Sequence, residues 1–240
     1  MKIVYKLTGN CLRSTTYCND HSGRGLQAVA LKADLRQQGS FCTFKAVDNF
    51  LAALRKYVPI SEEDAAYFYS FFKKKQYQRG ELLLKEGEVA HEVFFVMKGA
   101  LRQYFFNERG DERTCNFTFE HQFVTDLESF SRQAKSATHI IALEPAACLV
   151  LTCEDAVTCL KESPAVASLF GLIVENLATD TIRRIRSLLS KTPEEQIEEL
   201  TKTNPEMLRR VPQRYIAQYL GVAPESLSRI RKRMIANQKS

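Results

Sequence analysis

Four kinds of hydrophobic pattern follow one another along the 240-residue chain and predict four regions. Residues 1–44 are polar and basic with weak periodicity, which predicts an irregular extension; a flexible segment and an artefact of an upstream start codon both remain open. Residues 45–160 begin with helical spacing and continue as short alternating runs, which predicts a β-rich domain with flanking helices. Residues 161–190 carry one long helical stripe, and residues 191–240 contain several short helices. The expected fold class is therefore α+β.

The β-type pattern extends from Gln76 to about Thr152. Apolar and polar positions alternate in short runs that glycines interrupt. Asn107–Glu112 has the composition of a hairpin turn. Many short strands at close spacing predict an antiparallel roll or barrel. Ahead of it, a stripe over Val47–Leu54 and a helix-start signal at Ser61 predict a pair of helices.

A long helix is predicted from Ser163 to about Ser190. Its apolar positions continue over more turns than a small roll needs for cover. The preferred interpretation is a dimer seam, because coiled-coil-like faces are buried on a partner. The alternative is a core helix that lies on the roll. The stripe consists of Val166, Leu169, Phe170, Ile173, Leu177, Ile182, Ile185 and Leu188.

The segment Val211–Met234 has the pattern of a helix-turn-helix. Pro212 suits the first helical position, where a proline loses no hydrogen bond. Gly221 supplies the left-handed residue that ends the first helix, and the second helix begins near Pro224. The faces expected to be buried contain Ile216, Ala217, Leu220, Leu227, Ile230 and Met234. The alternative is a helical hairpin that only packs a core.

Positive charge is concentrated in this terminal unit. The whole chain carries a formal net charge of +6, whereas residues 209–240 contain eight basic residues and one acidic residue, a net charge of +7. Basic residues on a helix-turn-helix form a surface that attracts phosphates, so the charge favours DNA as the partner.

Composition indicates the compartment. No run of eighteen apolar residues is present, so no membrane span is predicted. The N-terminal sequence has no apolar core of a secretory signal. Seven cysteines without an export signal are typical of free thiols in a reducing cytoplasm. The expected location is therefore cytoplasmic.

The order of these parts, together with RYIAQYLGVAPESLSRIRKRM and FEHQFVTDLESF, resembles the Crp/Fnr superfamily of bacterial transcription regulators. The resemblance covers roughly Val47 to Met234. It implies a β-roll that senses an effector, a long helix that forms a homodimer, and paired recognition helices that read a two-fold symmetric operator in double-stranded DNA. Half-sites would then lie about 34 Å apart. RNA polymerase is a further partner that the resemblance admits.

The family's recognition residues match this sequence in part. Glu225 and Arg229 stand at the Glu and final Arg positions, while Pro224 replaces the first Arg. An arginine here suits bidentate contact with guanine, and a glutamate can accept from the cytosine amino group. The opening of the first helix is expected to touch the DNA backbone. The predicted DNA-binding residues are Gln213, Arg214, Tyr215, Pro224, Glu225, Ser226, Arg229, Lys232 and Arg233.

The corresponding effector pocket departs from the pattern of relatives that bind cyclic AMP. Those relatives show Gly-Glu-Leu and then Arg-Ser, whereas this chain has Thr125-Asp126-Leu127 and Lys135-Ser136. A carboxylate disfavours a phosphate, and lysine lacks the planar fork of arginine. We therefore expect no cyclic nucleotide and no cofactor. A ligand with a positive or hydroxyl-rich group remains open, as does a purely structural role in which these residues cap a short helix and pair with one another. The candidate pocket residues are Thr125, Asp126, Leu127, Glu128, Ser129, Arg132, Lys135 and Ser136.

Catalytic and metal sites are not expected. Cys11, Cys18 and Cys42 are too widely spaced to favour an iron–sulfur cluster. The histidines are isolated and form no His-x-His pair, which argues against a cupin-type metal enzyme. No nucleophile triad is readable, so no enzyme activity is predicted. Two alternatives to an effector-controlled regulator remain: a constitutive regulator whose roll is a scaffold, and a ligand-binding signalling module whose terminal helices bind a protein.

Overall fold

The computed structural model describes residues 41–56 and 59–237, with side chains described for 48–56 and 59–234. The side chains of Cys11, Cys18 and Cys42 lie outside this range, as does most of the predicted extension. Helix α3 begins at Phe41, so the boundary predicted between residues 44 and 45 falls inside a helix. Phe41 and Phe44 continue the helical spacing of the stripe that follows, which moves the start of the helix toward the N-terminus.

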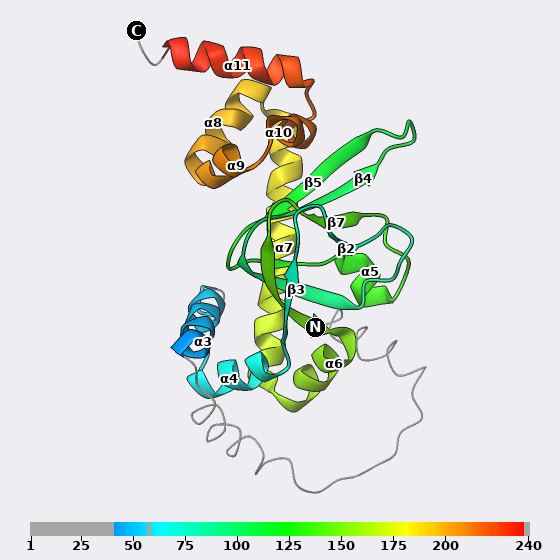
Figure 1. Ribbon diagram of the computed structural model, residues 1–240, viewed down its shortest axis with the longest axis vertical. Helices are drawn as coiled ribbons and strands as arrows, with labels where there is room; N and C mark the ends of the chain where they lie inside the picture. The colour runs from blue at the N-terminus through cyan, green and yellow to red at the C-terminus, as the bar shows by residue number, and fades with distance from the viewer. Residues whose placement is uncertain (1–40, 57–58, 238–240) are drawn as a thin grey trace, which may run out of the picture.

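Eight strands form the predicted antiparallel roll. They pair in two four-stranded sheets with the orders β1-β8-β3-β6 and β2-β7-β4-β5, and the roll occupies the middle of the molecule (Figure 1). The strands are β1 (Lys73–Tyr77), β2 (Leu82–Leu84), β3 (Glu92–Lys98), β4 (Leu101–Phe106), β5 (Glu112–Thr118), β6 (Phe123–Val124), β7 (His139–Ala142) and β8 (Ala146–Thr152).

Helices flank the roll at both ends of the chain (Figure 1). The predicted start of the second helix at Ser61 is confirmed, since its side chain accepts a hydrogen bond from the backbone N–H of Asp64. The helices are α3 (Phe41–Leu54), α4 (Glu62–Ser70), α5 (Leu127–Arg132), α6 (Cys153–Glu162), α7 (Pro164–Ser190), α8 (Pro193–Thr203), α9 (Pro205–Arg210), α10 (Gln213–Leu220) and α11 (Pro224–Asn237).

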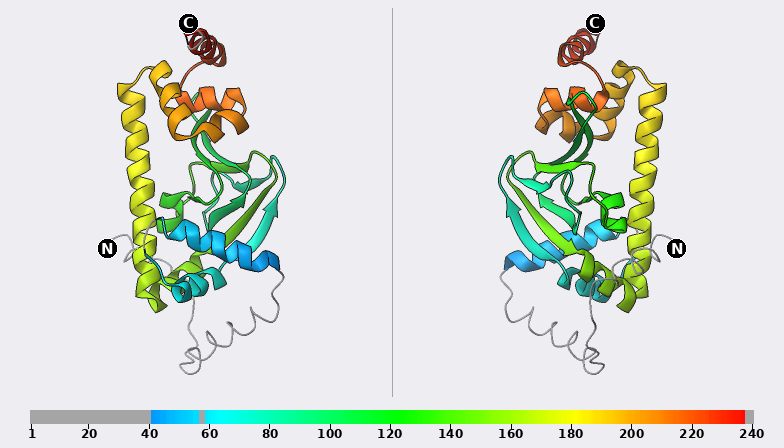
Figure 2. Two further views of the ribbon diagram at one scale, coloured as in Figure 1. Left: turned by 90° about the vertical axis from the view of Figure 1, so that its left-hand side faces the viewer. Right: turned by 90° about the vertical axis from the view of Figure 1, so that its right-hand side faces the viewer.

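The long helix α7 runs along one side of the molecule (Figure 2) and has two different apolar faces. Its first half is a core helix, because Val166, Leu169, Phe170, Ile173 and Val174 are buried in the main hydrophobic cluster. Its second half leaves apolar side chains uncovered. Their exposed fractions are 57% for Ile182, 50% for Ile185, 43% for Leu188 and 83% for Leu189. The prediction of one continuous seam is therefore wrong for the first half, where the alternative of a helix lying on the roll is correct.

By length and composition alone, α7 could also cross a membrane. An 18-residue window within its 27 residues has a mean hydropathy of 1.3, and 28% of that window is buried. The burial of the first half against the roll is the arrangement of a core helix.

The C-terminal helices share a second hydrophobic cluster with the roll. Phe117 and Phe119 lie on β5 and just after it, and they belong to the same cluster as Ile197, Met207 and Ile216 of helices α8, α9 and α10. Burial of this shared apolar surface favours contact between the two parts. The helices therefore stand directly on the sheet that contains β4 and β5.

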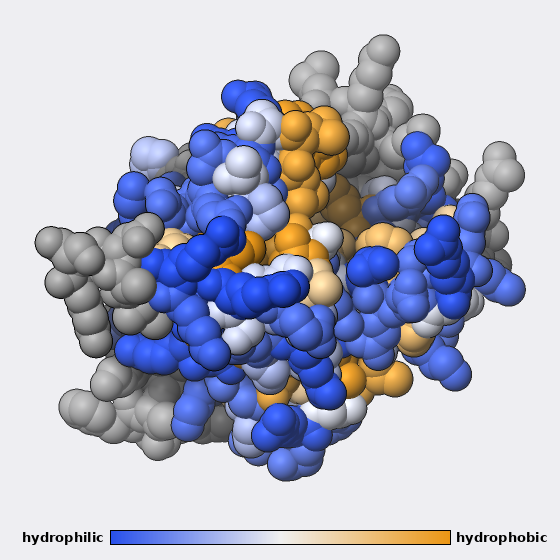
Figure 3. All heavy atoms as spheres, turned by 90° about the horizontal axis from the view of Figure 1, so that it is seen from above, coloured by the Kyte–Doolittle hydropathy of each residue, from blue (hydrophilic) through white to orange (hydrophobic). Residues whose placement is uncertain are grey.

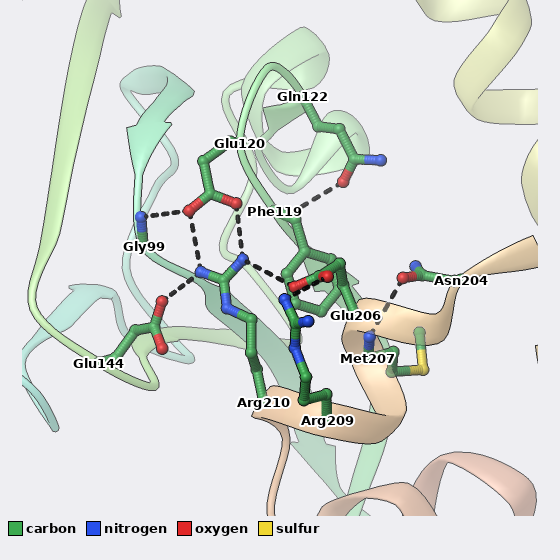
Figure 4. A network of polar contacts seen from close by, with 10 residues as sticks. All are labelled: Gly99, Phe119, Glu120, Gln122, Glu144, Asn204, Glu206, Met207, Arg209 and Arg210. Atoms are coloured by element: carbon green, nitrogen blue, oxygen red, sulfur yellow. Dashed lines mark hydrogen bonds and ion pairs between the residues drawn. The ribbon is translucent and has the colours of Figure 1, made fainter. Parts of the chain in front are cut away.

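An ionic cluster reinforces this joint (Figure 4). The guanidinium of Arg210 donates to both carboxylate oxygens of Glu120, at 2.7 and 2.9 Å, and to Glu144. The backbone N–H of Gly99 donates to the same Glu120 carboxylate at 2.9 Å. A side chain at Gly99 would not fit, because φ is +98° and a Cβ would lie 2.7 Å from the carbonyl oxygen of Pro145.

These contacts set the protonation of Glu120. Partial burial acts to raise the pKa of Glu120, but hydrogen bonds from Arg210 and backbone N–H groups, together with the charge of Arg210, lower it from the ordinary 4.5 to about 2. Because the folded pKa lies below the unfolded one, the stabilisation is present above pH 4.5 and is lost as the pH falls toward 2.

We predict that Glu120→Gln lowers the free energy of unfolding by about 1–3 kcal/mol at pH 7, because Arg210 loses a charged acceptor. The difference from the unmodified protein should shrink as the pH falls below the ordinary pKa. Urea unfolding at a series of pH values measures it. The exposed Glu198→Gln is the matched control and should leave the pH dependence unchanged. A difference that is constant from pH 7 to pH 3 would contradict the assigned role of the carboxylate.

Candidate nucleic-acid interface

The helix-turn-helix pattern folds as the sequence predicts. Gly221 adopts a left-handed conformation with φ +70° and ends α10. Ala217 and Leu227 are fully buried where the two helices pack together, and Ile230 is 5% exposed. One detail differs: Pro212 is the N-cap with ψ 137°, and the first helical residue is Gln213. The proline's fixed φ suits both positions, so the sequence signal could not separate them.

The opposite face of α11 points away from the rest of the molecule (Figure 1). Pro224, Glu225, Arg229, Lys232 and Arg233 are all exposed, and Ser226 is half-buried. Figure 3 looks down on this end, where mainly hydrophilic residues form the surface. An exposed basic helix face of this kind has the dimensions and donors for a DNA major groove.

Much of the positive charge in this unit is already paired. Arg209 contacts Glu206, and Arg233 contacts Glu194 of α8. Within the part of the chain that the structure describes, Arg229 and Lys232 have no carboxylate within 4.0 Å. The charge available to a phosphate backbone is therefore smaller than the composition indicates, and it is centred on α11.

The opening of α10 is only partly free. Gln213 and Arg214 are exposed, as expected for backbone contacts, but Tyr215 is half-buried. Its ring lies under two guanidinium groups, at 3.9 Å from Arg102 and 4.5 Å from Arg214, and its hydroxyl accepts from Arg214 at 2.7 Å. Tyr215 therefore contacts the roll.

Arg102 is a residue that the sequence reasoning did not identify. It lies on β4, is only 2% exposed, and donates to Gln218 on α10 at 2.7 Å. The alternating pattern of β4 places Arg102 on one face of the strand. The pattern does not indicate that a helix more than a hundred residues later in the sequence covers that face.

The candidate effector residues divide into two groups. Three of them meet inside: Asp126 caps α5 by accepting from the backbone N–H of Ser129 at 3.1 Å, and its other oxygen accepts from the hydroxyl of Ser136 at 2.7 Å. Ser129 and Ser136 are 1% and 3% exposed. Thr138 joins them, with its hydroxyl 3.3 Å from Asp126 and its oxygen accepting from Gln103 at 3.0 Å. The sequence reasoning missed Thr138 and Gln103. We call Asp126, Ser129, Ser136, Thr138 and Gln103 the Asp126 network.

The remaining candidates point elsewhere. Glu128 and Arg132 pair with each other at 2.9 Å on the surface, where 72% and 59% of their side chains are exposed. Lys135 is exposed, Leu127 packs against the core, and Thr125 donates to the backbone carbonyl of Glu92 at 2.9 Å. These contacts match the alternative in which the residues cap a short helix and pair with one another.

The chemistry of the Asp126 network differs from that of a phosphate site. Both carboxylate oxygens accept hydrogen bonds, one from the backbone N–H of Ser129 and the other from the hydroxyl of Ser136. A phosphate placed there would meet a like charge.

Part of the chain is similar to a known protein family. Residues 74–163 match the family model of the cyclic nucleotide-binding domain. Among the curated proteins, none matches the sequence significantly.

Among the solved structures that are similar to the chain in fold, three examples have low sequence identity. FixK2 from Bradyrhizobium japonicum is 18% identical with a TM-score of 0.60, over 70% of this chain and 86% of its own. The c-di-GMP responsive global regulator CLP from Xanthomonas campestris is 14% identical with a TM-score of 0.61, over 74% and 93%. A transcriptional regulator ascribed to the Crp/Fnr family, from Eubacterium rectale, is 15% identical with a TM-score of 0.59, over 76% and 88%.

Residues 74–163 therefore match the cyclic nucleotide-binding domain, and the chain as a whole is similar in fold to FixK2 and to the Eubacterium rectale protein.

Proposed function

We propose that this chain is a homodimeric, sequence-specific DNA-binding transcription regulator, with a β-roll that senses an effector other than a cyclic nucleotide. The observation that carries the proposal is the outward basic face of α11 on a closely packed helix-turn-helix. Leu227 and Ile230 hold α11 on its neighbours, while Arg229 and Lys232 remain exposed. Such a helix can enter a major groove without unfolding any part of its own domain.

The proposed roles of the exposed residues differ. Arg229 lies in the second turn of α11, where its planar fork suits the two acceptors of a guanine edge. Glu225, one turn earlier on the same face, suits a cytosine amino group. Lys232 offers a point charge without a fork and suits a phosphate. Gln213 and Arg214 at the start of α10 are proposed to contact the DNA backbone.

The second half of α7 supports the homodimer. Ile182, Ile185, Leu188 and Leu189 form an apolar stripe that nothing in the described part of the chain covers. Water contact along such a stripe is unfavourable, and a second copy of the same helix would remove it. Two recognition helices would then face one duplex from half-sites about one helical turn apart.

We predict that Arg229→Ala costs about 1–3 kcal/mol of binding free energy at one base pair, because a bidentate base contact is lost. Lys232→Ala should weaken all sequences alike and reduce the slope of affinity against salt by about one. Titration of an in vitro selected duplex and of its single-base variants at several salt concentrations measures both effects. Unchanged duplex binding in both variants would refute the groove-reading role of α11.

We predict that Ile185→Glu converts the dimer into monomers, because a charge would be buried in the seam at a cost of several kcal/mol. Sedimentation velocity gives the oligomeric state, and operator binding should weaken with it. Arg183→Glu, on the solvated side of the same helix with 72% of its side chain exposed, is the matched control and should remain dimeric. A dimeric Ile185→Glu protein would show that the stripe is not the seam.

We predict that cyclic AMP leaves the melting temperature unchanged, because Asp126 already accepts the hydrogen bonds that a phosphate would need. A ligand that binds the native state alone raises the melting temperature, so thermal-shift measurements are a direct test. Stabilisation by micromolar cyclic AMP would overturn this interpretation of the roll.

A further inference from the structure

The buried guanidinium of Arg102 joins the roll to the helix-turn-helix. Its Nε donates to the hydroxyl of Thr114 at 2.8 Å, and its Nη2 donates to Glu112 at 2.8 Å and to the side-chain oxygen of Gln218 at 2.7 Å. Thr114 donates to the same Gln218 oxygen at 3.1 Å. Two strands and α10 therefore meet at a single polar centre.

Two tyrosine rings enclose this centre. The guanidinium lies 4.2 Å from the ring centroid of Tyr104 on its own strand and 3.9 Å from that of Tyr215 on α10. Both distances lie within the range of cation–π contact. A planar group held by two rings and by in-plane hydrogen bonds has few ways to shift, so it fixes both distance and orientation.

The local structure of the hairpin creates the centre. Gln103 pairs with Asn116 and Tyr104 pairs with Thr114, so Cys115 is an extra residue in β5. Such a bulge moves the next side chains of its strand to the other face. It places Thr114 and Glu112 on the face that carries Arg102 and Tyr104.

The other contacts of the joint constrain α10 less specifically. The shared cluster around Phe117 is apolar, and apolar contacts are non-directional. Arg210 holds α9 to the roll, and Arg184 ties α10 to α7 through its contact with Tyr219. Arg102, in contrast, is a charged group of the roll that donates directly to a side chain of α10.

We propose that Arg102 is a positioning residue for operator recognition: by fixing α10 on the roll, it sets the orientation of α11 and hence the half-site spacing that the dimer accepts. The inference rests on the proposed DNA-binding function. The roll packs on α7, and the seam lies on α7, so the distance between two recognition helices depends on how each helix-turn-helix sits on its own roll. A loosened joint leaves phosphate attraction intact and broadens the accepted spacing.

The test compares spacing discrimination with affinity. Full-length protein is titrated with a selected operator, with duplexes whose half-sites are moved apart or together by one and two base pairs, and with an unrelated duplex. Gln218→Ala is the main variant, because Arg102 then keeps its hairpin partners Thr114 and Glu112. The roll therefore stays intact. We expect Gln218→Ala to lose roughly tenfold of the discrimination between correct and altered spacing, the size of a typical contact coupling. Its affinity for the unrelated duplex should change less than twofold.

Two further variants complete the experiment. Arg102→Lys retains the charge but not the planar fork, and it should lose discrimination to a similar extent. In the double variant Arg102→Lys/Gln218→Ala the two losses should be non-additive, because both report one contact. Arg113→Ala is the matched control: this arginine lies on the same hairpin, is 44% exposed and contacts Asp111 at 3.6 Å. It should discriminate as the unmodified protein does.

The outcomes separate the two proposals. If the unmodified protein binds no duplex, the proposed function is wrong, and the proposed role of Arg102 is wrong with it. Duplex binding with full spacing discrimination in Gln218→Ala overturns the role of Arg102 alone. Additive losses in the double variant also overturn it, since the two side chains would then act independently.

Discussion

The joint between the roll and the C-terminal helices depends on arginines that are buried or half-buried beside their hydrogen-bond partners. A guanidinium removed from water costs several kcal/mol unless its donors are satisfied. Arg102 and Arg210 meet this requirement only when α9 and α10 stand on the outer face of β4 and β5, where Glu120 and Gln218 supply acceptors. The apolar cluster brings the two parts together, and the arginines restrict them to one arrangement. The exposed face of α11 follows from that arrangement.

Local spacing predicted the local elements well. The small Ala217, the left-handed Gly221 and the apolar Leu227 act within a few residues of one another, so their pattern alone indicated how α10 and α11 pack. The alternation of short strands likewise predicted the roll. Periodicity identified the apolar positions of α7, but it could not indicate which of them face the roll and which remain exposed, since both halves have the same spacing.

The candidate sites were harder to predict because they combine distant segments. Gln218 meets Arg102 across 116 positions of sequence, and no local rule describes such a contact. The effector residues posed a related difficulty. Residue types indicated that Asp126 departs from the pattern of a phosphate site, yet they could not show that Ser129 and Ser136 already donate to its two oxygens. Hydrogen-bond satisfaction is a property of the folded surroundings.

The single extra residue in β5 has a consequence for how this fold tolerates insertions and deletions. Side chains alternate between the two faces of a strand, so removal of Cys115 would make Thr114 and Asn116 neighbours on opposite faces, as their partners Tyr104 and Gln103 already are. The pairs Tyr104–Thr114 and Phe106–Glu112 would then persist, and Glu112 and Thr114 would stay on the face that carries Arg102. A loss of one codon at this position would thus leave the inner and outer surfaces of the hairpin tip in place, whereas in a strand without an extra residue a one-residue deletion would exchange them.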